Sequence, residues 1–489
     1  MKNNPANQID FYKADHRSQY PKGTEIVFSN LTPRTSRNKE IKEVVFFGLQ
    51  YFVKEYLISR WNEDFFQQPK EKVVNDYKRR IETSLGKGAI TFEHIEALHD
   101  LGYLPMEIKA LPEGSLIPMR CPCLVMFNTK KEFFWLTNYF ETILSCVIWG
   151  AITSATTAYQ YKKLLTEFAD KTVGNRDFVQ WQGHDFSFRG MFGYEAACIS
   201  GAAHLLSFTG TDTIPAIDFH EKYYGADADK ELIGASVPAT EHSVMSMGTQ
   251  ENEIATFERL ISEIYPNGIV SIVSDTWNFW KVITEYLPQL KERILARNGK
   301  VVIRPDSGDP VKIICGDKDA PIGTPEYKGA IECMWEVFGG TTTEKGYKLL
   351  DGHIGLIYGD SITVERCKQI CGQLADKGFC SFNVVFGIGS YTYQYVTRDT
   401  FGFAVKATYG EVNGESRAIF KTPKTDDGTK NSAKGLIAIY KSENGNGYDM
   451  HDGLNWKEVN NCELKTVFKD GKIENEQTLS QIRELLKTF

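Results

Sequence analysis

The sequence has no CxxC pair of cysteines, no long uninterrupted apolar run and no excess of basic residues. Its ten cysteines come closest together as Cys121 with Cys123 and as the helix-spaced pair Cys367 and Cys371, which indicates neither a zinc site nor a disulfide framework. Helix-spaced cysteines are most often small core residues. We therefore expect reduced thiols in a cytoplasmic protein.

Basic residues are outnumbered, because 56 Lys and Arg face 63 Asp and Glu, for a formal net charge of −7. This balance argues against a protein that coats nucleic acid or an anionic membrane, so we expect neither as a partner. A ligand that carries phosphate groups must therefore meet a local group of basic side chains.

No segment has the pattern of a signal peptide or a membrane span. The N-terminal residues lack an apolar run, and the most apolar stretch, 142–159, is uncharged but repeatedly interrupted by Thr and Ser. We interpret this stretch as a buried helix.

Short, apolar, β-branched runs recur between about residues 180 and 390, and several end in an acidic residue or a glycine. The clearest runs are 269–275, 301–306, 354–360 and 384–390. Such runs are typical of parallel strands buried on both faces, with the functional residues at their carboxyl ends. Segment 324–340, which opens on Thr-Pro and ends on Gly-Gly, predicts a crossover helix between two of them.

The two ends of the chain have shorter, alternating segments, and Asn413–Gly414 and Asp470–Gly471 are typical of two-residue hairpin turns. We predict the α/β class, with two domains. A β-rich domain with flanking helices is assembled from residues 1–150 and 391–489, and an irregular, barrel-like α/β catalytic domain spans 151–390.

Three aspartates, Asp275, Asp306 and Asp360, follow successive predicted strands. Neighbouring carboxylates repel unless a cation joins them, and Mg²⁺ commonly bridges carboxylates to substrate phosphates. We predict Asp275 and Asp306 as Mg²⁺ ligands, directly or through water, although each aspartate alone could simply cap a helix.

Arg304, two residues before Asp306, could bind an anionic oxygen or form a salt bridge in a turn. The glycine-rich strand end Gly387–Ser390 could hold a phosphate on its free N–H groups. Further positive charge follows at Arg398, Lys406, Arg417 and Lys421.

A second set of candidates precedes the acidic strands, in segments 184–190, 210–212 and 241–243. Phe186 could stack on a flat heterocycle, and Asp212 could accept hydrogen bonds from an amide. His242 could act as an acid, a base or a nucleophile. Each could instead have a purely structural role.

Motifs spread in one order over nearly the whole chain carry a family resemblance. They are Asp10–Lys13, Phe47–Tyr51, Trp135–Asn138, His184–Gly190, Gly210–Thr213, Ser236–Ser243, Val273–Asp275, Ile303–Gly308, Gly346–Leu350, Thr397–Asp399 and Thr466–Gly471. On these motifs the chain resembles the nicotinamide phosphoribosyltransferases, a type II phosphoribosyltransferase family.

The resemblance implies an enzyme of NAD salvage, a pentosyltransferase that moves the ribose phosphate of phosphoribosyl pyrophosphate onto nicotinamide. It also implies Mg²⁺, ATP as an optional coupling substrate, and a homodimer with two active sites at the interface. A nicotinate phosphoribosyltransferase of the same fold and a non-catalytic NAD-metabolite binder are the alternatives.

Residue roles follow from the matching motifs. Phe186 and Tyr12, the latter from the partner subunit, would sandwich the pyridine ring. Asp212 would bind the carboxamide, with Arg189 near the ring and Ser271 nearby. The phosphoribosyl group and its phosphates would contact Arg189, Arg304, Asp306, Gly359, Asp360, Gly389, Ser390, Arg398, Lys406 and Lys421. His242 would accept a phosphoryl group from ATP with help from Asp275, and we predict His242, Asp275 and Asp306 as catalytic.

Asp212 also suggests which substrate is preferred, because a carboxylate accepts an amide N–H but repels nicotinate. Two positions depart from the family pattern, Ser390 in place of a glycine and Ala404 in place of a serine. The second loses one hydroxyl contact to phosphate, which weighs against ATP coupling.

Overall fold

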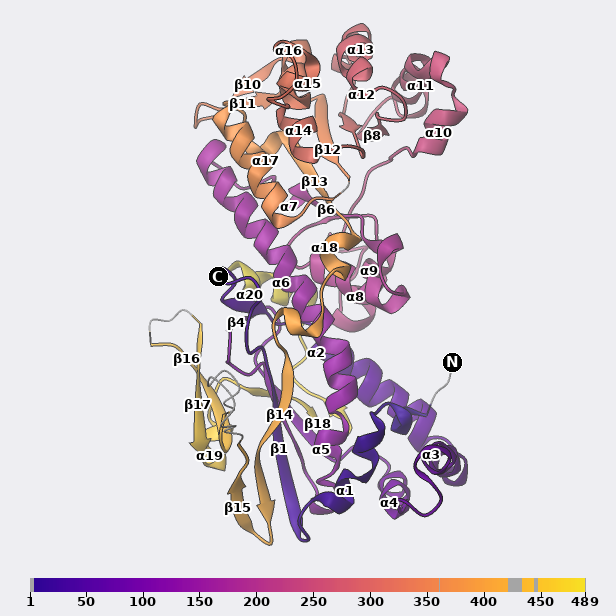
Figure 1. The fold of residues 1–489 in the computed structure, drawn as a ribbon, viewed down its shortest axis with the longest axis vertical. Helices are drawn as coiled ribbons and strands as arrows, with labels where there is room; N and C mark the ends of the chain where they lie inside the picture. The colour runs from indigo at the N-terminus through magenta and orange to yellow at the C-terminus, as the bar shows by residue number, and fades with distance from the viewer. Residues whose placement is uncertain (1–3, 360, 421–432, 444–446, 489) are drawn as a thin grey trace. The chain divides into compact units, whose positions relative to one another are not determined.

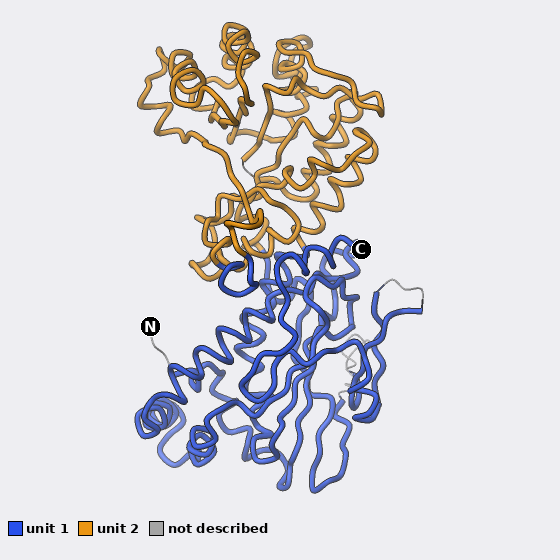
Figure 2. Tube along the Cα trace, turned by 180° about the vertical axis from the view of Figure 1, so that it is seen from behind, with its two compact units in different colours: residues 1–156, 219–226, 396–489 blue, residues 157–218, 227–395 orange. Residues whose placement is uncertain are grey.

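The computed structural model describes residues 4–359, 361–420, 433–443 and 447–488. The chain divides into two compact units: unit 1 comprises residues 1–156, 219–226 and 396–489, and unit 2 comprises residues 157–218 and 227–395 (Figures 1 and 2). The boundaries expected from the sequence lay at 150 and 390 and did not include the short segment 219–226.

Unit 1 is built on a seven-stranded antiparallel sheet of order β15-β14-β1-β5-β3-β18-β19 (Figure 1). Its strands come from both ends of the chain: β1 Thr24–Thr32, β3 Met106–Ala110, β5 Leu124–Asn128, β14 Ala404–Val412, β15 Glu415–Ala418, β18 Lys465–Lys469 and β19 Lys472–Ile473. Two smaller pairs join β2 Glu43–Val45 to β4 Leu116–Pro118, and β16 Leu436–Lys441 to β17 Tyr448–Leu454.

Both predicted hairpins are confirmed. Val412 pairs with Glu415 across Asn413–Gly414, and Lys469 pairs with Lys472 across Asp470–Gly471. All four turn residues have positive φ, between 48° and 82°. A two-residue turn of this kind requires left-handed backbone at both positions, which Asn, Asp and Gly tolerate best.

The helices of unit 1 lie mainly in its N-terminal part. They are α1 His16–Gln19, α2 Leu49–Phe52, α3 Lys70–Leu85, α4 Glu93–Leu101, α5 Leu136–Tyr139, residues 141–156 of α6 Glu141–Thr172, α19 Trp456–Asn460 and α20 Leu479–Lys487.

Segment 219–226 joins unit 1 through aromatic packing and a buried carboxylate. Tyr224 stacks on Phe47 with ring centroids 5.0 Å apart, and Phe219 packs against Tyr51 at 4.7 Å. The Tyr224 hydroxyl also donates to Glu113 Oε2 at 2.9 Å. These contacts link residues more than one hundred positions apart, so no local pattern predicts them.

The stretch 142–159 lies in α6, Glu141–Thr172. Among the described residues, α6 alone is long and apolar enough to cross a membrane, but 56% of its most apolar window is buried inside the protein. Burial of this kind is typical of a core helix, as the sequence analysis predicts.

Unit 2 contains a six-stranded, all-parallel sheet of order β7-β6-β13-β12-β9-β8. Its strands are β6 Gly183–Asp185, β7 Gly210–Thr211, β8 Val270–Val273, β9 Val301–Arg304, β12 Ile354–Tyr358 and β13 Val384–Ile388. The four predicted runs supply β8, β9, β12 and β13, which are neighbours in the sheet.

Segment 235–240 connects the two edges of this sheet. On one side Ala235 N–H donates to Thr209 O at 2.7 Å, and on the other Ser271 N–H donates to Pro238 O at 2.9 Å. The sheet and this segment therefore form a ring, which confirms the predicted barrel-like α/β fold.

Helices cover the outside of the sheet, among them α14, α16 and α17 (Figure 1). The helices of unit 2 after α6 are α7 Val179–Gln182, α8 Tyr194–His204, α9 Ile214–Tyr224, which ends in the unit 1 segment, α10 His242–Met247, α11 Glu253–Arg259, α12 Phe279–Lys281, α13 Leu287–Leu295, α14 Pro310–Cys315, α15 Pro325–Lys328, α16 Ala330–Phe338, α17 Val364–Asp376 and α18 Ser390–Gln394. A short two-stranded sheet pairs β10 Gly340–Thr342 with β11 Lys348–Leu350.

The predicted crossover helix is two helices, α15 and α16, separated at Gly329. Gly329 has φ of 84°, and a Cβ there would lie 2.3 Å from the backbone nitrogen of Gly316. Close approach of two backbone segments breaks the helix at this glycine, although the capping signals at both ends of the segment are where the sequence placed them.

Candidate functional site

A cavity of about 350 Å³ lies on the inner face of the parallel sheet in unit 2. Along β8 and β9, Ser271, Val302 and Arg304 line it, whereas the alternate residues Ile272 and Ile303 pack in the hydrophobic core. Successive side chains of a strand point to opposite faces, so each strand supplies both the core and the cavity wall. The predicted site residues Phe186, Asp212, Ser271 and Arg304 all line this cavity.

Asp212 is held at the cavity wall by two hydrogen bonds to one carboxylate oxygen. Its Oδ1 lies 2.8 Å from His184 Nε2 and accepts from the Ser236 hydroxyl at 2.6 Å. The Asp212 side chain remains 44% exposed, so the carboxylate is anchored yet accessible.

The electrostatic surroundings keep Asp212 ionised. Partial burial by itself raises the pKa of a carboxyl, but the hydrogen bonds from His184 and Ser236 and the positive charge of Arg304 outweigh it and lower the pKa of Asp212 below its ordinary value. Asp212 therefore presents a negative charge to the cavity at neutral pH.

The Phe186 ring rests on two glycines. A Cβ on Gly387 would lie 2.5 Å from Phe186 Cδ2, and a Cβ on Gly359 would lie 3.6 Å from Phe186 Cε2. The Phe186 ring also contacts the His184 ring, with centroids 4.7 Å apart and a tilt of 48°. The absence of a side chain at Gly387 is what lets the aromatic ring sit at this end of the strands, whereas a Cβ on Gly359 would be in ordinary contact with it.

Two polar groups of the cavity wall have unused hydrogen-bonding capacity among the described residues. The Ser271 hydroxyl is buried without a hydrogen-bond partner, and so is Arg304 Nε. A buried polar group without a partner is costly, so both groups are candidates for contact with a bound ligand.

Asp275, one of the three aspartates predicted at the strand ends, makes several contacts within the protein. Asp275 Oδ2 accepts from the backbone N–H groups of Asp306 and Ser307, at 2.9 and 2.7 Å, and from the Ser307 hydroxyl. Asp275 thus organises the loop after β9. Its Oδ1 accepts no hydrogen bond from a described residue and lies 3.9 Å from His242 Nε2.

Asp306 lies between Arg304 and the end of β12. Its Oδ2 is 3.7 Å from Arg304 Nε, and a Cβ on Gly359 would come within 2.3 Å of its Oδ1. Arg304 also donates from Nη2 to the Thr240 carbonyl at 2.5 Å. The predicted Arg304, Asp306 and Gly359 are therefore direct neighbours, whereas Asp360 lies outside the described residues.

His242 begins α10, and its side chain is 49% exposed. Its Nδ1 lies 3.0 Å from the Thr276 hydroxyl, and Nε2 faces Asp275. The imidazole is thus oriented from both nitrogens and still open to solvent.

Arg189 is exposed beside the end of β13, and it forms no ion pair with another described residue. Gly190 packs directly on Ser390, since a Cβ on Gly190 would lie 2.0 Å from Ser390 Oγ. Gly389 precedes α18 and has open space where a side chain would be. Arg189, Gly389 and Ser390 therefore lie in adjoining segments.

Tyr12, Arg398 and Lys406 belong to unit 1. Tyr12 is 59% exposed, Lys406 is exposed on β14, and Arg398 lies in the turn 398–400. Lys421 lies outside the described residues. Sequence reasoning missed two further cations here, because Arg34 and Arg37 hydrogen-bond to segment 397–402 next to Arg398.

Sequence reasoning also missed His184 and Ser236 as individual site residues. His184 and Phe186 are two positions apart in and just after β6, and that spacing places both on one face of a strand. This signal could have identified His184. Ser236 has no comparable signal, because only the ring closure by segment 235–240 brings it to Asp212.

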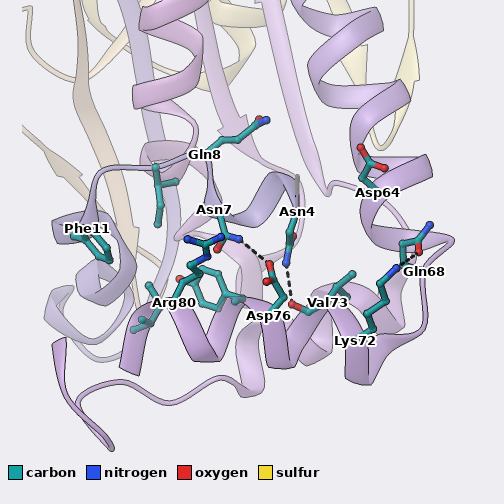
Figure 3. Close-up of a pocket in the computed structure, with 13 residues that line it drawn as sticks. Asn4, Asn7, Gln8, Phe11, Asp64, Gln68, Lys72, Val73, Asp76 and Arg80 are labelled. Atoms are coloured by element: carbon teal, nitrogen blue, oxygen red, sulfur yellow. Dashed lines mark hydrogen bonds between the residues drawn. The ribbon is translucent and has the colours of Figure 1, made fainter. Parts of the chain in front are cut away.

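A second hollow, of about 640 Å³, lies in unit 1 and contains none of the predicted site residues (Figure 3). Polar groups that line it form hydrogen bonds with each other. Asn7 Nδ2 donates to Asp76 Oδ2 at 2.9 Å, and Asn4 Nδ2 donates to the Val73 carbonyl at 2.8 Å. The barrel cavity, with its converging polar groups, is therefore the candidate site.

Two family models match the chain. Residues 181–484 match the nicotinate phosphoribosyltransferase (NAPRTase) family, and residues 4–108 match the nicotinamide phosphoribosyltransferase N-terminal domain. The chain belongs to the nicotinate phosphoribosyltransferase family.

Relatives within this family carry the name nicotinamide phosphoribosyltransferase. A protein of Acinetobacter baylyi of that name is 57% identical, over 99% of this chain and 97% of its own length. One of Mycoplasma pneumoniae is 35% identical, over 88% of this chain and 96% of its own length.

Solved structures of the nicotinate phosphoribosyltransferase fold resemble the chain at low identity. A nicotinate-nucleotide pyrophosphorylase of Pyrococcus furiosus aligns with a TM-score of 0.58 and 15% identity, over 99% of this chain and 95% of its own. Human nicotinic acid phosphoribosyltransferase aligns with a TM-score of 0.52 and 14% identity, over 98% of this chain and 93% of its own. These likenesses support the fold alone.

The close packing of Phe186 on Gly387 leads to a testable prediction. We expect Gly387→Ala to displace the ring or the strand, because its Cβ would overlap Phe186, and to destabilise the protein by about 1–3 kcal/mol. Thermal unfolding measures the loss, and calorimetry should show weaker nicotinamide binding. Gly372→Ala in α17 is the matched control, since its Cβ would meet nothing within 4 Å. Equal behaviour of the two variants would contradict the packing argument.

Proposed function

We propose that the protein transfers the 5-phosphoribosyl group of phosphoribosyl pyrophosphate to nicotinamide, giving nicotinamide mononucleotide and pyrophosphate in NAD salvage. The observation that carries the proposal is the ionised, accessible Asp212 in a cavity that also holds Phe186 and the unpartnered hydroxyl of Ser271. The naming of the relatives at 57% and 35% identity supports it.

The cavity residues match the two ends of a carboxamide. The amide N–H donates to Asp212, the Ser271 hydroxyl donates to the amide carbonyl, and the pyridine ring stacks on Phe186. Nicotinate offers no N–H and brings a second negative charge to Asp212, so the site favours the amide over the acid.

In the transfer step the ring nitrogen of nicotinamide forms a bond to C1 of the ribose while the bond from C1 to the pyrophosphate oxygen breaks. Positive charge develops on the sugar and negative charge on the leaving group. Asp306 beside the sugar stabilises the former, and Arg189 and Arg304 bind the phosphates. Arg398, Lys406 and Lys421 are proposed as further phosphate contacts.

The acidic end of the sheet fits a Mg²⁺ ion held mainly by substrate phosphates and water. Among the described residues no group of three or more His, Cys, Asp or Glu side chains forms a metal cage, and Asp275 Oδ2 is occupied by three donors. Asp275 Oδ1 and the Asp306 carboxylate would hold the ion directly or through water. The ion would neutralise charge on the pyrophosphate as it leaves.

All ten cysteines are free thiols, nine of them buried. Free thiols support the proposal of a reducing, cytoplasmic location.

The specificity proposal is tested with purified protein, phosphoribosyl pyrophosphate, Mg²⁺ and either nicotinamide or nicotinate. We expect faster turnover of nicotinamide. Asp212→Asn should lower kcat/KM for nicotinamide about 10- to 100-fold, because a hydrogen bond to a charged group is lost, and should reduce the preference for the amide. Release of pyrophosphate measures both rates.

Asp170→Asn is the matched control, since Asp170 forms an exposed ion pair with Arg176 and should tolerate the change. Faster turnover of nicotinate by the wild type would make the protein a nicotinate phosphoribosyltransferase instead. Binding of nicotinamide without release of pyrophosphate would indicate a non-catalytic binder.

A homodimer with shared sites is proposed from a group of exposed aromatic side chains in unit 2. Phe192 is 89% exposed, Tyr395 79%, Tyr194 65% and Tyr391 59%, on elements next to Arg189 and Ser390. Exposed apolar patches of this kind mark interaction sites. A second copy covering this patch would complete the site with Tyr12, whose ring is unburied in its own chain.

Replacing Phe192 with Asp should therefore shift the protein from dimer to monomer and abolish most activity, because the charge would have to be buried in the interface. Light scattering gives the mass, and the nicotinamide assay gives the activity. Ile322 is also apolar and 87% exposed but lies outside this patch, so Ile322→Asp should change neither the mass nor the activity. A fully active monomeric wild type would overturn the shared site.

ATP is proposed as a coupling substrate that phosphorylates His242, which is exposed and oriented by Thr276 and Asp275. We expect His242→Ala to lose stimulation of synthesis by ATP, since no nucleophile remains at that position. The ratio of rates with and without ATP measures this, with His353→Ala as the histidine control. Unchanged stimulation in His242→Ala would refute the phosphoryl transfer.

A further inference from the structure

Asp212 has two carboxylate oxygens with different surroundings. Oδ1 receives both protein donors, His184 Nε2 and the Ser236 hydroxyl. No described residue donates to Oδ2. The protein therefore occupies one oxygen and leaves the other to a ligand in the cavity.

Of these two donors, the His184 side chain is the more buried. The imidazole is buried beside β7, whereas Ser236 lies on an exposed segment. Because the partner is a carboxylate that only accepts hydrogen bonds, Nε2 must carry the hydrogen. The hydrogen bond thus sets both the tautomer of His184 and the rotation of the Asp212 carboxylate.

The same imidazole contacts the aromatic part of the site. Its ring centroid lies 4.7 Å from that of Phe186, and Gly210 admits its other edge, since a Cβ on Gly210 would lie 2.8 Å from His184 Nδ1. One side chain therefore touches the residue that binds the amide and the residue that stacks on the ring.

We propose that His184 is the positioning residue for nicotinamide specificity: it holds the Asp212 carboxylate so that Oδ2 faces the amide N–H, at a fixed distance from the Phe186 ring. This inference rests on the proposed function. It assigns to His184 a role in the choice between the amide and the acid, exerted through Asp212 rather than by contact with the reacting atoms.

The charged groups around this pair define how the role depends on pH. Arg304 faces Asp212, and His204 faces His184. Burial lowers the pKa of His204 to about 4, so His204 is neutral under assay conditions. Removing His184 removes the main interaction that lowers the pKa of Asp212, so Asp212 would take up a proton at a higher pH than in the wild type.

The test compares wild type, His184→Ala, His184→Gln and His184→Asn with nicotinamide and nicotinate over a range of pH. A Gln amide reaches the position of Nε2, whereas the Asn amide is too short to reach Asp212. We expect His184→Ala and His184→Asn to raise KM for nicotinamide about 10- to 100-fold with a smaller change in kcat. Both should lower the ratio of amide to acid turnover and move the acid limb of kcat/KM for nicotinamide to higher pH.

His184→Gln should recover most of the wild-type KM and amide preference. His353→Ala is the matched control, because His353 also bonds to an aspartate, Asp351 at 2.7 Å, and lies outside the cavity lining. It should leave KM and the substrate ratio unchanged.

The proposal is overturned if His184→Ala keeps KM and the substrate ratio within twofold of wild type, or if Gln and Asn at this position behave alike. If His184→Ala does not fold, the comparison of Gln with Asn decides the question, and failure of both of these to fold would assign His184 a purely structural role. A wild type that does not convert nicotinamide would refute the proposed function itself, which is a separate result.

Discussion

Parallel pairing of the strands β6, β13, β12, β9 and β8 is the constraint on which the site depends. Parallel strands in register end at the same edge of the sheet, so the residues that follow them converge whatever their separation in sequence. Asp275, Asp306 and Gly359 come together in this way. The alternation of side chains along each strand then separates the core from the cavity, and both are built from the same short segments.

Charge at this edge is balanced by local contacts rather than by the net composition. The chain carries a formal net charge of −7, yet the cavity wall places Arg304 in the same lining as the Asp212 carboxylate. Asp275 is the clearest case, because three donors from the β9 loop satisfy one of its oxygens. The Asp275 carboxylate therefore has two roles: Oδ2 orders the loop after β9, and Oδ1 accepts no hydrogen bond from a described residue and is left to a ligand.

Glycines at the strand ends have a steric function. Gly387 leaves room for Phe186, Gly359 for Asp306 and Gly210 for His184, since a Cβ at any of the three would overlap that neighbour. Glycine at positions 387 and 210 is therefore a requirement for placing the rings of Phe186 and His184. Ser390 shows how a departure is accommodated, because its hydroxyl packs on Gly190, which has no side chain.

The sequence by itself determined four of the six strands of the parallel sheet, both hairpin turns and the choice of candidate site residues, because periodicity, turn chemistry and motifs are local properties of the chain. Only the tertiary structure decided that segment 219–226 packs in unit 1, that Gly329 splits the crossover helix, and that segment 235–240 closes the ring and brings Ser236 to Asp212. Each of these depends on contacts between segments distant in the sequence. Burial and hydrogen-bond geometry between such segments arise from packing, and no local pattern of residues specifies them.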